Sequence, residues 1–146
     1  QYCLGWCYYY DGRGVKKNKE LAVQLYQKAA EQGHAEAQYY LGWYYYYDGE
    51  GAKKNKELAV QLYQKAAEQG YAEAQNNLGD CYRDGRDVDK NHELAVRWYR
   101  KAAMQGHARA QCGLGGCYAN GWGVEKNYEL AVQWWQKAAE QDYRNA

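Results

Sequence analysis

The sequence predicts an all-α solenoid of about four stacked helix-turn-helix repeats. The stretch KNKELAVQLYQKAAEQG at 17–33 recurs without change at 54–70, and looser copies occupy 90–106 and 126–142. The glutamates that precede each Leu-Ala-Val run lie 37, 36 and 36 residues apart, a period typical of stacked helical pairs. Apolar residues within each copy recur every three or four positions, which indicates helices.

We place the repeats at approximately 1–37, 38–74, 75–110 and 111–146, as one array. The final YRNA and the initial QYCLG together match the internal junction HAEAQYYLG. Joining the two ends would restore one more repeat in phase. We therefore expect an array without caps, because a capping repeat normally carries a polar outer face. Six residues are predicted to form an end-to-end stacking surface: Leu4, Trp6, Tyr8, Trp134, Trp135 and Ala138.

The first helix of each repeat is predicted from segments such as 35–45. Its residues Ala37, Leu41 and Tyr45 lie four positions apart and share one helix face. A glycine follows leucine inside this helix at four equivalent positions: Gly5, Gly42, Gly79 and Gly115. Glycine inside a helix costs about 1 kcal/mol relative to alanine. We therefore expect a neighbouring helix to approach so closely there that a Cβ atom would clash.

A turn such as Asp-Gly-Glu-Gly at 48–51 ends the first helix of each repeat. Gly-x-Gly also occurs in phosphate-binding loops, but here it follows a helix and lacks the third glycine and the lysine of those loops. The first two repeats carry one residue more before this turn than the last two, as 41–48 and 78–84 show. The extra residue lies in a run of tyrosines. Either the first helix bulges there or the loop lengthens.

The second helix is predicted to begin after an asparagine, Asn55 or Asn91, which is a good N-cap residue. Glycine follows the equivalent helix in three repeats, at Gly33, Gly70 and Gly106, as expected for a left-handed C-cap. Asp142 replaces this glycine in the fourth repeat. We expect the last turn of that helix to be strained or frayed.

Composition excludes several classes of protein. The 146 residues fit one domain or one run of repeats, and the net charge of +1 provides no basic field for nucleic acid. No stretch approaches the ~18 consecutive apolar residues that a membrane span requires. Ser, Thr, Ile, Phe and Pro are absent, whereas tyrosine occurs 18 times. This bias fits either a natural repeat or an inferred or designed sequence.

Neither catalysis nor a resident cofactor or metal is expected. The five cysteines are odd in number and unevenly spread, unlike a disulfide framework. Cys3 and Cys7 share a helix face, but no histidine joins them to complete a zinc site. His34 and His107 occupy a repeat position that is tyrosine elsewhere, so a packing or surface role is favoured. Ser and Thr are absent and no cysteine lies near a histidine in sequence, so no set of nucleophile, base and orienting group can be assembled. Carboxylates brought together by the fold are the alternative that the sequence leaves open.

The chain resembles the Sel1-like repeat family, a relative of the tetratricopeptide repeats. The pattern A-x-A-Q-x-x-L-G-x-x-Y-x-x-G fits 72–85, and A-x-x-W-Y-x-x-A-A-x-Q-G fits 95–106. The resemblance implies a right-handed α-solenoid whose first helices line a concave surface. It also implies a protein-interaction scaffold, often secreted or in signalling and secretion pathways, and it implies no chemistry. The cysteine pair that bridges each repeat in some members is missing here.

First-helix positions that differ between repeats form the candidate binding surface. It comprises Tyr2, Trp6, Tyr9, Tyr10, Tyr39, Trp43, Tyr46, Tyr47 and Arg83. The matching stretches of the third and fourth repeats are polar or small: Asn76, Asp80, Cys112, Gly116 and Ala119. Tyrosine and tryptophan combine a large contact area with a polar tip, which suits interfaces.

Two functions remain open from the sequence. One is structural: the chain is a segment or period of a longer head-to-tail solenoid or filament, with itself as partner. The other is an adaptor that binds a partner protein, a peptide or a glycan through the aromatic surface.

Overall fold

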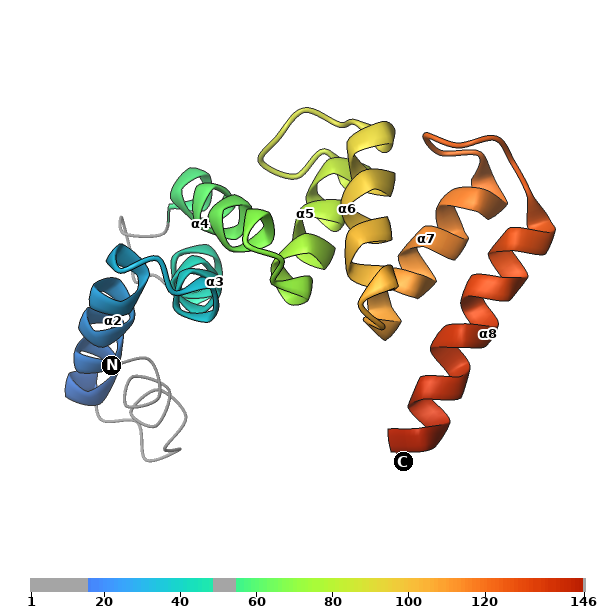
Figure 1. Ribbon diagram of the computed structural model, residues 1–146. Coiled ribbons are helices and arrows are strands. Elements are labelled where there is room, and N and C mark those ends of the chain that lie inside the picture. Colours follow the sequence, from blue (N-terminus) through green and yellow to red (C-terminus); the bar gives the residue numbers. More distant parts are fainter. Residues whose placement is uncertain (1–15, 49–54, 146) are drawn as a thin grey trace. The chain divides into compact units, whose positions relative to one another are not determined.

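The computed structural model describes residues 16–48 and 55–145, and all regular secondary structure within them is helical (Figure 1). The chain divides into two compact units on either side of the Gln69–Gly70 bond. Unit 1 contains α2 (Lys16–Glu31), α3 (Ala35–Trp43), the π-helical turn η1 (Tyr44–Asp48) and α4 (Lys56–Glu68). Unit 2 contains α5 (Ala72–Asp84), α6 (His92–Met104), α7 (Ala108–Asn120) and α8 (Tyr128–Asn145).

Within each unit, every helix packs on its neighbour in sequence. In unit 1, α3 contacts both α2 and α4, and in unit 2 the contacts run from α5 to α6, α6 to α7 and α7 to α8. Helix α5 also contacts α7, so the first helices of the third and fourth repeats are neighbours. Alanines and tyrosines of the second helices fill the core, among them the fully buried Tyr26 and Tyr99.

The predicted helix ends are confirmed. The side chains of Asn55 and Asn91 accept hydrogen bonds from the backbone N–H groups three residues later, at 3.0 and 3.1 Å. Gly33, Gly70 and Gly106 have φ angles of 85°, 94° and 89°, the left-handed region in which glycine is favoured.

The expectation that α8 would fray at Asp142 is wrong, because the helix continues through this residue to Asn145. Without a glycine to adopt the left-handed conformation, the chain stays right-handed. One consequence concerns Gln141. The matching Gln69 and Gln105 are C-cap residues, whereas Gln141 lies inside its helix.

A glutamine hydrogen bond that recurs in two repeats is missing from the fourth. Gln69 Nε2 donates to the buried Gln38 at 2.8 Å, and Gln105 Nε2 donates to the buried Gln75 at 2.9 Å. Their counterpart Gln111 is also buried, and its Oε1 has no hydrogen-bond partner among the described residues. Because α8 continues past Asp142, Gln141 is not a C-cap residue, and this accounts for the missing hydrogen bond.

The recurring Leu-Gly glycines mark the closest helix contacts, as predicted. A Cβ atom on Gly42 would lie 3.1 Å from both the Tyr63 ring and a backbone oxygen. A Cβ atom on Gly79 would lie 2.6 Å from the Tyr99 ring, well inside van der Waals contact. In the second, third and fourth repeats, the second helix therefore places an aromatic ring against the glycine of its own first helix.

The extra residue of the second repeat forms a π-helix rather than a longer loop. Helix α3 ends at Trp43, and η1 follows directly. In the third repeat the α-helix instead runs unbroken to Asp84, where Gly85 caps it with φ 70°. The insertion does not displace Tyr45 from its place in the repeat, as the hydrogen bond of 3.1 Å from the Asn55 N–H to the Tyr45 carbonyl shows. The extra residue of the first repeat lies outside the described residues.

Candidate functional site

Three of the predicted surface aromatics form one group, here called the aromatic cluster: Trp43, Tyr46 and Tyr47. The Tyr47 ring centroid lies 5.4 Å from that of Trp43 and 4.6 Å from that of Tyr46. The Lys56 ammonium lies 5.3 Å from the Tyr46 centroid. Tyr47 is 55% exposed. A π-helical turn therefore presents a mostly aromatic surface with one cation beside it.

Tyr39, one turn before Trp43, has a different role. Its ring contacts Tyr40 at 5.3 Å and Tyr63 at 5.6 Å, and the side chain is half-buried. Tyr39 thus contributes to packing between α3 and α4. Four further predicted members of the surface lie outside the described residues: Tyr2, Trp6, Tyr9 and Tyr10.

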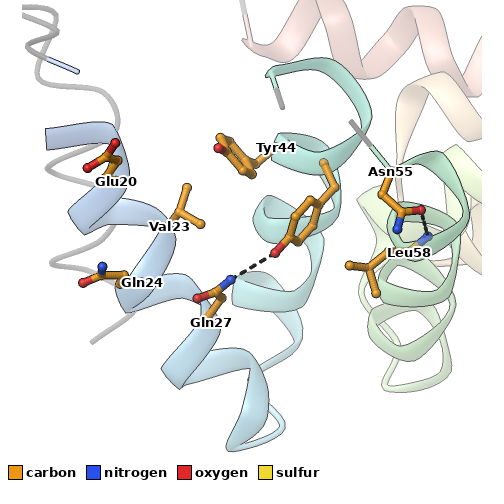
Figure 2. A pocket seen from close by; sticks show the side chains of 8 residues that line it. Glu20, Val23, Gln24, Gln27, Tyr44, Asn55 and Leu58 are labelled. Atoms are coloured by element: carbon orange, nitrogen blue, oxygen red, sulfur yellow. Dashed lines mark hydrogen bonds between the residues drawn. The ribbon is translucent and has the colours of Figure 1, made fainter. Parts of the chain in front are cut away.

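A cleft of ≈ 620 Å³ with a mixed polar and apolar lining is found on unit 1 (Figure 2). Its lining consists of Glu20, Val23, Gln24, Gln27, Tyr44, Tyr45, Asn55 and Leu58. Figure 2 shows Val23 and Gln27 of α2 pointing toward Tyr44 and Leu58. Gln27 Nε2 donates to the Tyr45 hydroxyl at 3.0 Å, so one bond already crosses it. Amide, hydroxyl and carboxylate groups here suit hydrogen bonding to a polar chain.

In the third repeat, Arg83 belongs to a network of charged groups. It lies 2.9 Å from a carboxylate oxygen of Asp84 and 3.7 Å from one of Asp80. The hydrogen bond to Asp84 raises the pKa of Arg83. Asp80 also accepts from the Tyr99 hydroxyl, and burial followed by this bond raises the pKa of Tyr99. The network keeps Tyr99 protonated and Arg83 charged.

The polar or small residues that match the candidate binding surface in the third and fourth repeats differ in their burial. Asn76 is only 2% exposed and contributes to the core. Its position on the inner side of α5 explains this. In the fourth repeat, Cys112 is exposed, Gly116 has open space beside it and Ala119 is half-buried. This part of α7 is therefore smooth and lacks large side chains.

Several titratable groups of unit 2 have pKa values shifted by burial or by a neighbouring group. Burial raises the pKa of both Cys81 and Cys117 to about 11, so both stay thiols at neutral pH. His107 is an N-cap whose Nδ1 accepts from the Ala110 N–H at 3.2 Å. Its Nε2 lies 2.9 Å from Glu73, and this bond lowers the pKa of Glu73. Among the described residues, no group of three metal-ligating side chains comes together.

Helix α8 exposes positions that its counterpart α6 buries. Val132 is 45% and Trp135 41% exposed, whereas the equivalent Val96 and Tyr99 are 3% and 0% exposed. Ala139 is exposed as well, although the equivalent Ala103 is buried. We call Val132, Trp135 and Ala139 the open face of α8. In α6 the same face is covered by α7, since a Cβ atom on Gly113 would lie 2.8 Å from the Tyr99 ring.

Only one predicted stacking residue belongs to this face. Trp135 does, but Trp134 is half-buried against the core of unit 2, and Ala138 is 2% exposed. Val132 and Ala139 were missed, although comparison with their buried equivalents in the other repeats could have identified them. Leu4, Trp6 and Tyr8 lie outside the described residues. In the described parts of the chain, no helix has the length and apolar character needed to cross a membrane.

Comparison with known proteins identifies the repeats. The Sel1 repeat family matches residues 1–34, 35–71, 72–107 and 108–143. A Sel1 repeat protein from Oxalobacter formigenes is 44% identical over 96% of this chain, with a TM-score of 0.85. A protective antigen of uropathogenic Escherichia coli, which displays the same repeat fold, is 38% identical over 96% of this chain, also with a TM-score of 0.85.

A smaller relative agrees. Cysteine rich protein B of Helicobacter pylori is 30% identical over 88% of this chain and 92% of its own length, with a TM-score of 0.65. The chain spans 55% of the Oxalobacter protein and 30% of the Escherichia antigen. No curated protein matches the chain in sequence. The all-α repeat solenoid predicted from the sequence is confirmed.

Proposed function

The chain belongs to the Sel1 repeat family, and on that premise we propose that it is a non-enzymatic scaffold that joins another Sel1 repeat head to tail. Sel1-repeat proteins are helical repeat scaffolds for protein interaction. The proposed contact is the open face of α8, and the proposed partner is the first helix of a repeat. That helix comes either from a second copy of the chain or from further repeats of a longer polypeptide.

The exposure of Val132 and Trp135 is the observation that carries the proposal. Their equivalents on α6 are buried because α7 covers them, and Tyr99 is packed from two sides, by Gly79 and by Gly113. Trp135 has one such neighbour in the described residues, Gly115. Apolar surface removed from water contributes about 25 cal/mol per Å². A covering helix would therefore be favourable.

The alignment of the repeats identifies the segment proposed to cover the open face of α8. Gln-Cys-Gly-Leu-Gly at 111–115 aligns with Gln-Tyr-Cys-Leu-Gly at 1–5. In this register Cys3 corresponds to Gly113, the residue that packs on Tyr99. Gln1 takes the position of Gln111, whose Nε2 donates to the Ala103 carbonyl at 3.2 Å. Head-to-tail contact of this kind is heterologous, so it produces open filaments unless the rotation closes.

Sedimentation velocity over a concentration series tests the contact. We expect the chain to sediment faster as concentration rises, and Val132→Glu or Ala139→Glu to abolish the change by placing a charge on the face. Gln136→Glu, an exposed position on the same helix, is the matched control and should behave like the unmodified chain. Trp135 is left in place because its ring packs on Gly115.

A tandem fusion of two copies tests whether the same contact forms between repeats of one polypeptide. The fusion should resist urea better than the single chain, and Val132→Glu in the first copy should remove this gain. A single chain that stays monomeric, together with a fusion that gains no stability, would rule out the head-to-tail scaffold.

The aromatic cluster supports a second candidate function, an adaptor for a partner protein, a peptide or a glycan. Its support is the grouping of three rings around Tyr47, since aromatic side chains are enriched at binding hot spots. Binding of a labelled peptide library and an oligosaccharide panel should be lost in the Trp43→Ala, Tyr47→Ala variant. Tyr128→Ala removes another exposed tyrosine and should have no effect. Equal binding by all three proteins would eliminate this candidate.

A further inference from the structure

Helix α6 differs from the other second helices at three outward positions. The other three helices carry glutamine, glutamine and glutamate there, for example Gln61, Gln64 and Glu68. Helix α6 carries Arg97, Arg100 and Met104 instead, beside the lysine that all four share. The substitutions replace a face of mixed polarity with a cationic one.

These residues line a groove of ≈ 510 Å³ on unit 2. Its lining consists of Gln75, Arg97, Arg100, Lys101, Met104 and Gln105. No carboxylate of the described residues lies within salt-bridge distance of Arg97, Arg100 or Lys101. Met104 is 74% exposed, so an apolar side chain lies at the edge of the cationic groove.

Two of the three cations are held in place by neighbouring aromatic residues. The Arg100 guanidinium donates to the Tyr118 hydroxyl at 3.1 Å. The Lys101 ammonium lies 4.8 Å from the Trp98 ring centroid. Both contacts limit the freedom of a long side chain, which lowers the entropy that a ligand would otherwise have to remove. The groove therefore presents its charges partly ordered.

We propose that this groove binds an acidic segment of a partner polypeptide in which an apolar side chain lies among the carboxylates. The three cations provide the charge complementarity, and carboxylates would supply the ion pairs that they lack. Met104 is flexible and polarizable, so it adapts to an apolar side chain of the ligand. A peptide fits better than a nucleic acid, because Met104 offers no charge to a phosphate and no flat ring to a base. The site uses neither the open face of α8 nor the aromatic cluster.

Fluorescence anisotropy with a labelled peptide of glutamates around a central leucine tests the proposal. The decisive variant is Arg97→Gln, Arg100→Gln, Met104→Glu, which gives α6 the outward residues of the other repeats. It should fold normally, since Gln27 makes the same bond to Tyr45 that Arg100 makes to Tyr118. We expect this variant to bind roughly tenfold more weakly, from the loss of two exposed ion pairs and one apolar contact.

Two controls separate the groove from general charge attraction. Lys137→Gln on α8 removes a cation outside the groove and should leave the affinity unchanged. A peptide with lysine in place of glutamate should not bind. Added salt should weaken binding of the acidic peptide, because exposed ion pairs are screened. Equal binding by the triple variant, or tighter binding of a single-stranded RNA than of the peptide, would overturn the proposal.

Discussion

Unit 1 and unit 2 fill equivalent positions of the repeat with side chains of opposite size. In unit 1, Tyr40 of α3 stacks on Tyr26 of α2, with ring centroids 5.8 Å apart and an interplanar angle of 18°. The equivalent position in the fourth repeat is Gly113, onto which the ring of Tyr99 packs directly. One interface stacks two rings and the other places one ring against backbone. The difference shows that a tyrosine of the second helix accepts either partner.

The positions that face away from the core differ just as strongly. Trp43 in unit 1 corresponds to Gly116 in unit 2, and Tyr46 corresponds to Ala119. Trp43 belongs to the aromatic cluster, whereas a Cβ atom on Gly116 would meet nothing within 4 Å. The repeat therefore accommodates a large aromatic side chain or none at the position of Trp43.

Alanine substitutions at glycine should separate the tight contact from the open one most clearly. Gly79→Ala places a methyl group 2.6 Å from the fully buried Tyr99 ring. We expect it to lower the free energy of unfolding by roughly 1–2 kcal/mol, the cost of overpacking less the gain in helix propensity. Gly42→Ala in unit 1 has contacts of 3.1 Å and should change stability less. Urea unfolding followed by circular dichroism measures both.

Gly116→Ala is the control for this comparison, because the added methyl group enters open space. It should raise the free energy of unfolding by up to about 1 kcal/mol through helix propensity alone. If Gly79→Ala and Gly116→Ala changed stability equally, the proposed close approach at the Leu-Gly glycine would be wrong.

Deletion of Tyr47 should make the second repeat more like the third. The deletion shortens the segment 41–48 to the length of 78–84, so we expect η1 to become α-helical and the aromatic cluster to lose its central ring. The lost ring pairs are worth about 0.5–1.5 kcal/mol each, and relief of the π-helix opposes this loss. A net change of about 1 kcal/mol is expected. Hydrogen exchange of the 44–48 amides and tryptophan fluorescence report the two effects.

The smallest expected effect concerns pH and the Glu73–His107 contact of unit 2. Because the folded pKa of Glu73 is lowered, the contact stabilises the protein above the unfolded pKa and is lost as pH falls through the folded value. Glu73→Gln should remove this part of the acid sensitivity. The carboxylate is 43% exposed, so we expect less than about 1 kcal/mol.

Urea unfolding at neutral pH and at acidic pH measures the difference. His107→Asn keeps an N-cap acceptor but removes the partner of Glu73, so it should reduce the acid sensitivity equally. If Glu73→Gln destabilised the protein by the same amount at every pH, the contact would not depend on the charge of Glu73.

Much of the fold could be predicted from the sequence because its signals are local. N-cap asparagines, C-cap glycines and apolar spacing act within one or two turns of helix, and the structure places helices accordingly. The Leu-Gly glycines were also interpretable, since only close packing offsets their cost inside a helix. Asp142 was misjudged because a residue that disfavours a left-handed cap can simply remain helical.

The candidate surfaces depended on contacts that spacing does not reveal. Asn76 and Tyr39 share the first-helix pattern with exposed residues, yet one is buried and the other packs on Tyr63. Whether the extra tyrosine lengthened a loop or formed a π-helix was open from the sequence. Hydrogen bonding resolves it, because Asn55 binds the Tyr45 carbonyl and leaves the extra residue within the helical turn.

The sequence by itself determined the repeat period, the helix ends and the glycines that allow helices to meet. Only the tertiary structure decided which residues at equivalent repeat positions are covered by a neighbouring helix. Val96 and Val132 occupy the same place in their repeats, but α7 covers only the first of them. The physical reason is that helical periodicity specifies which side chains share a face, whereas burial of that face requires another element packed against it.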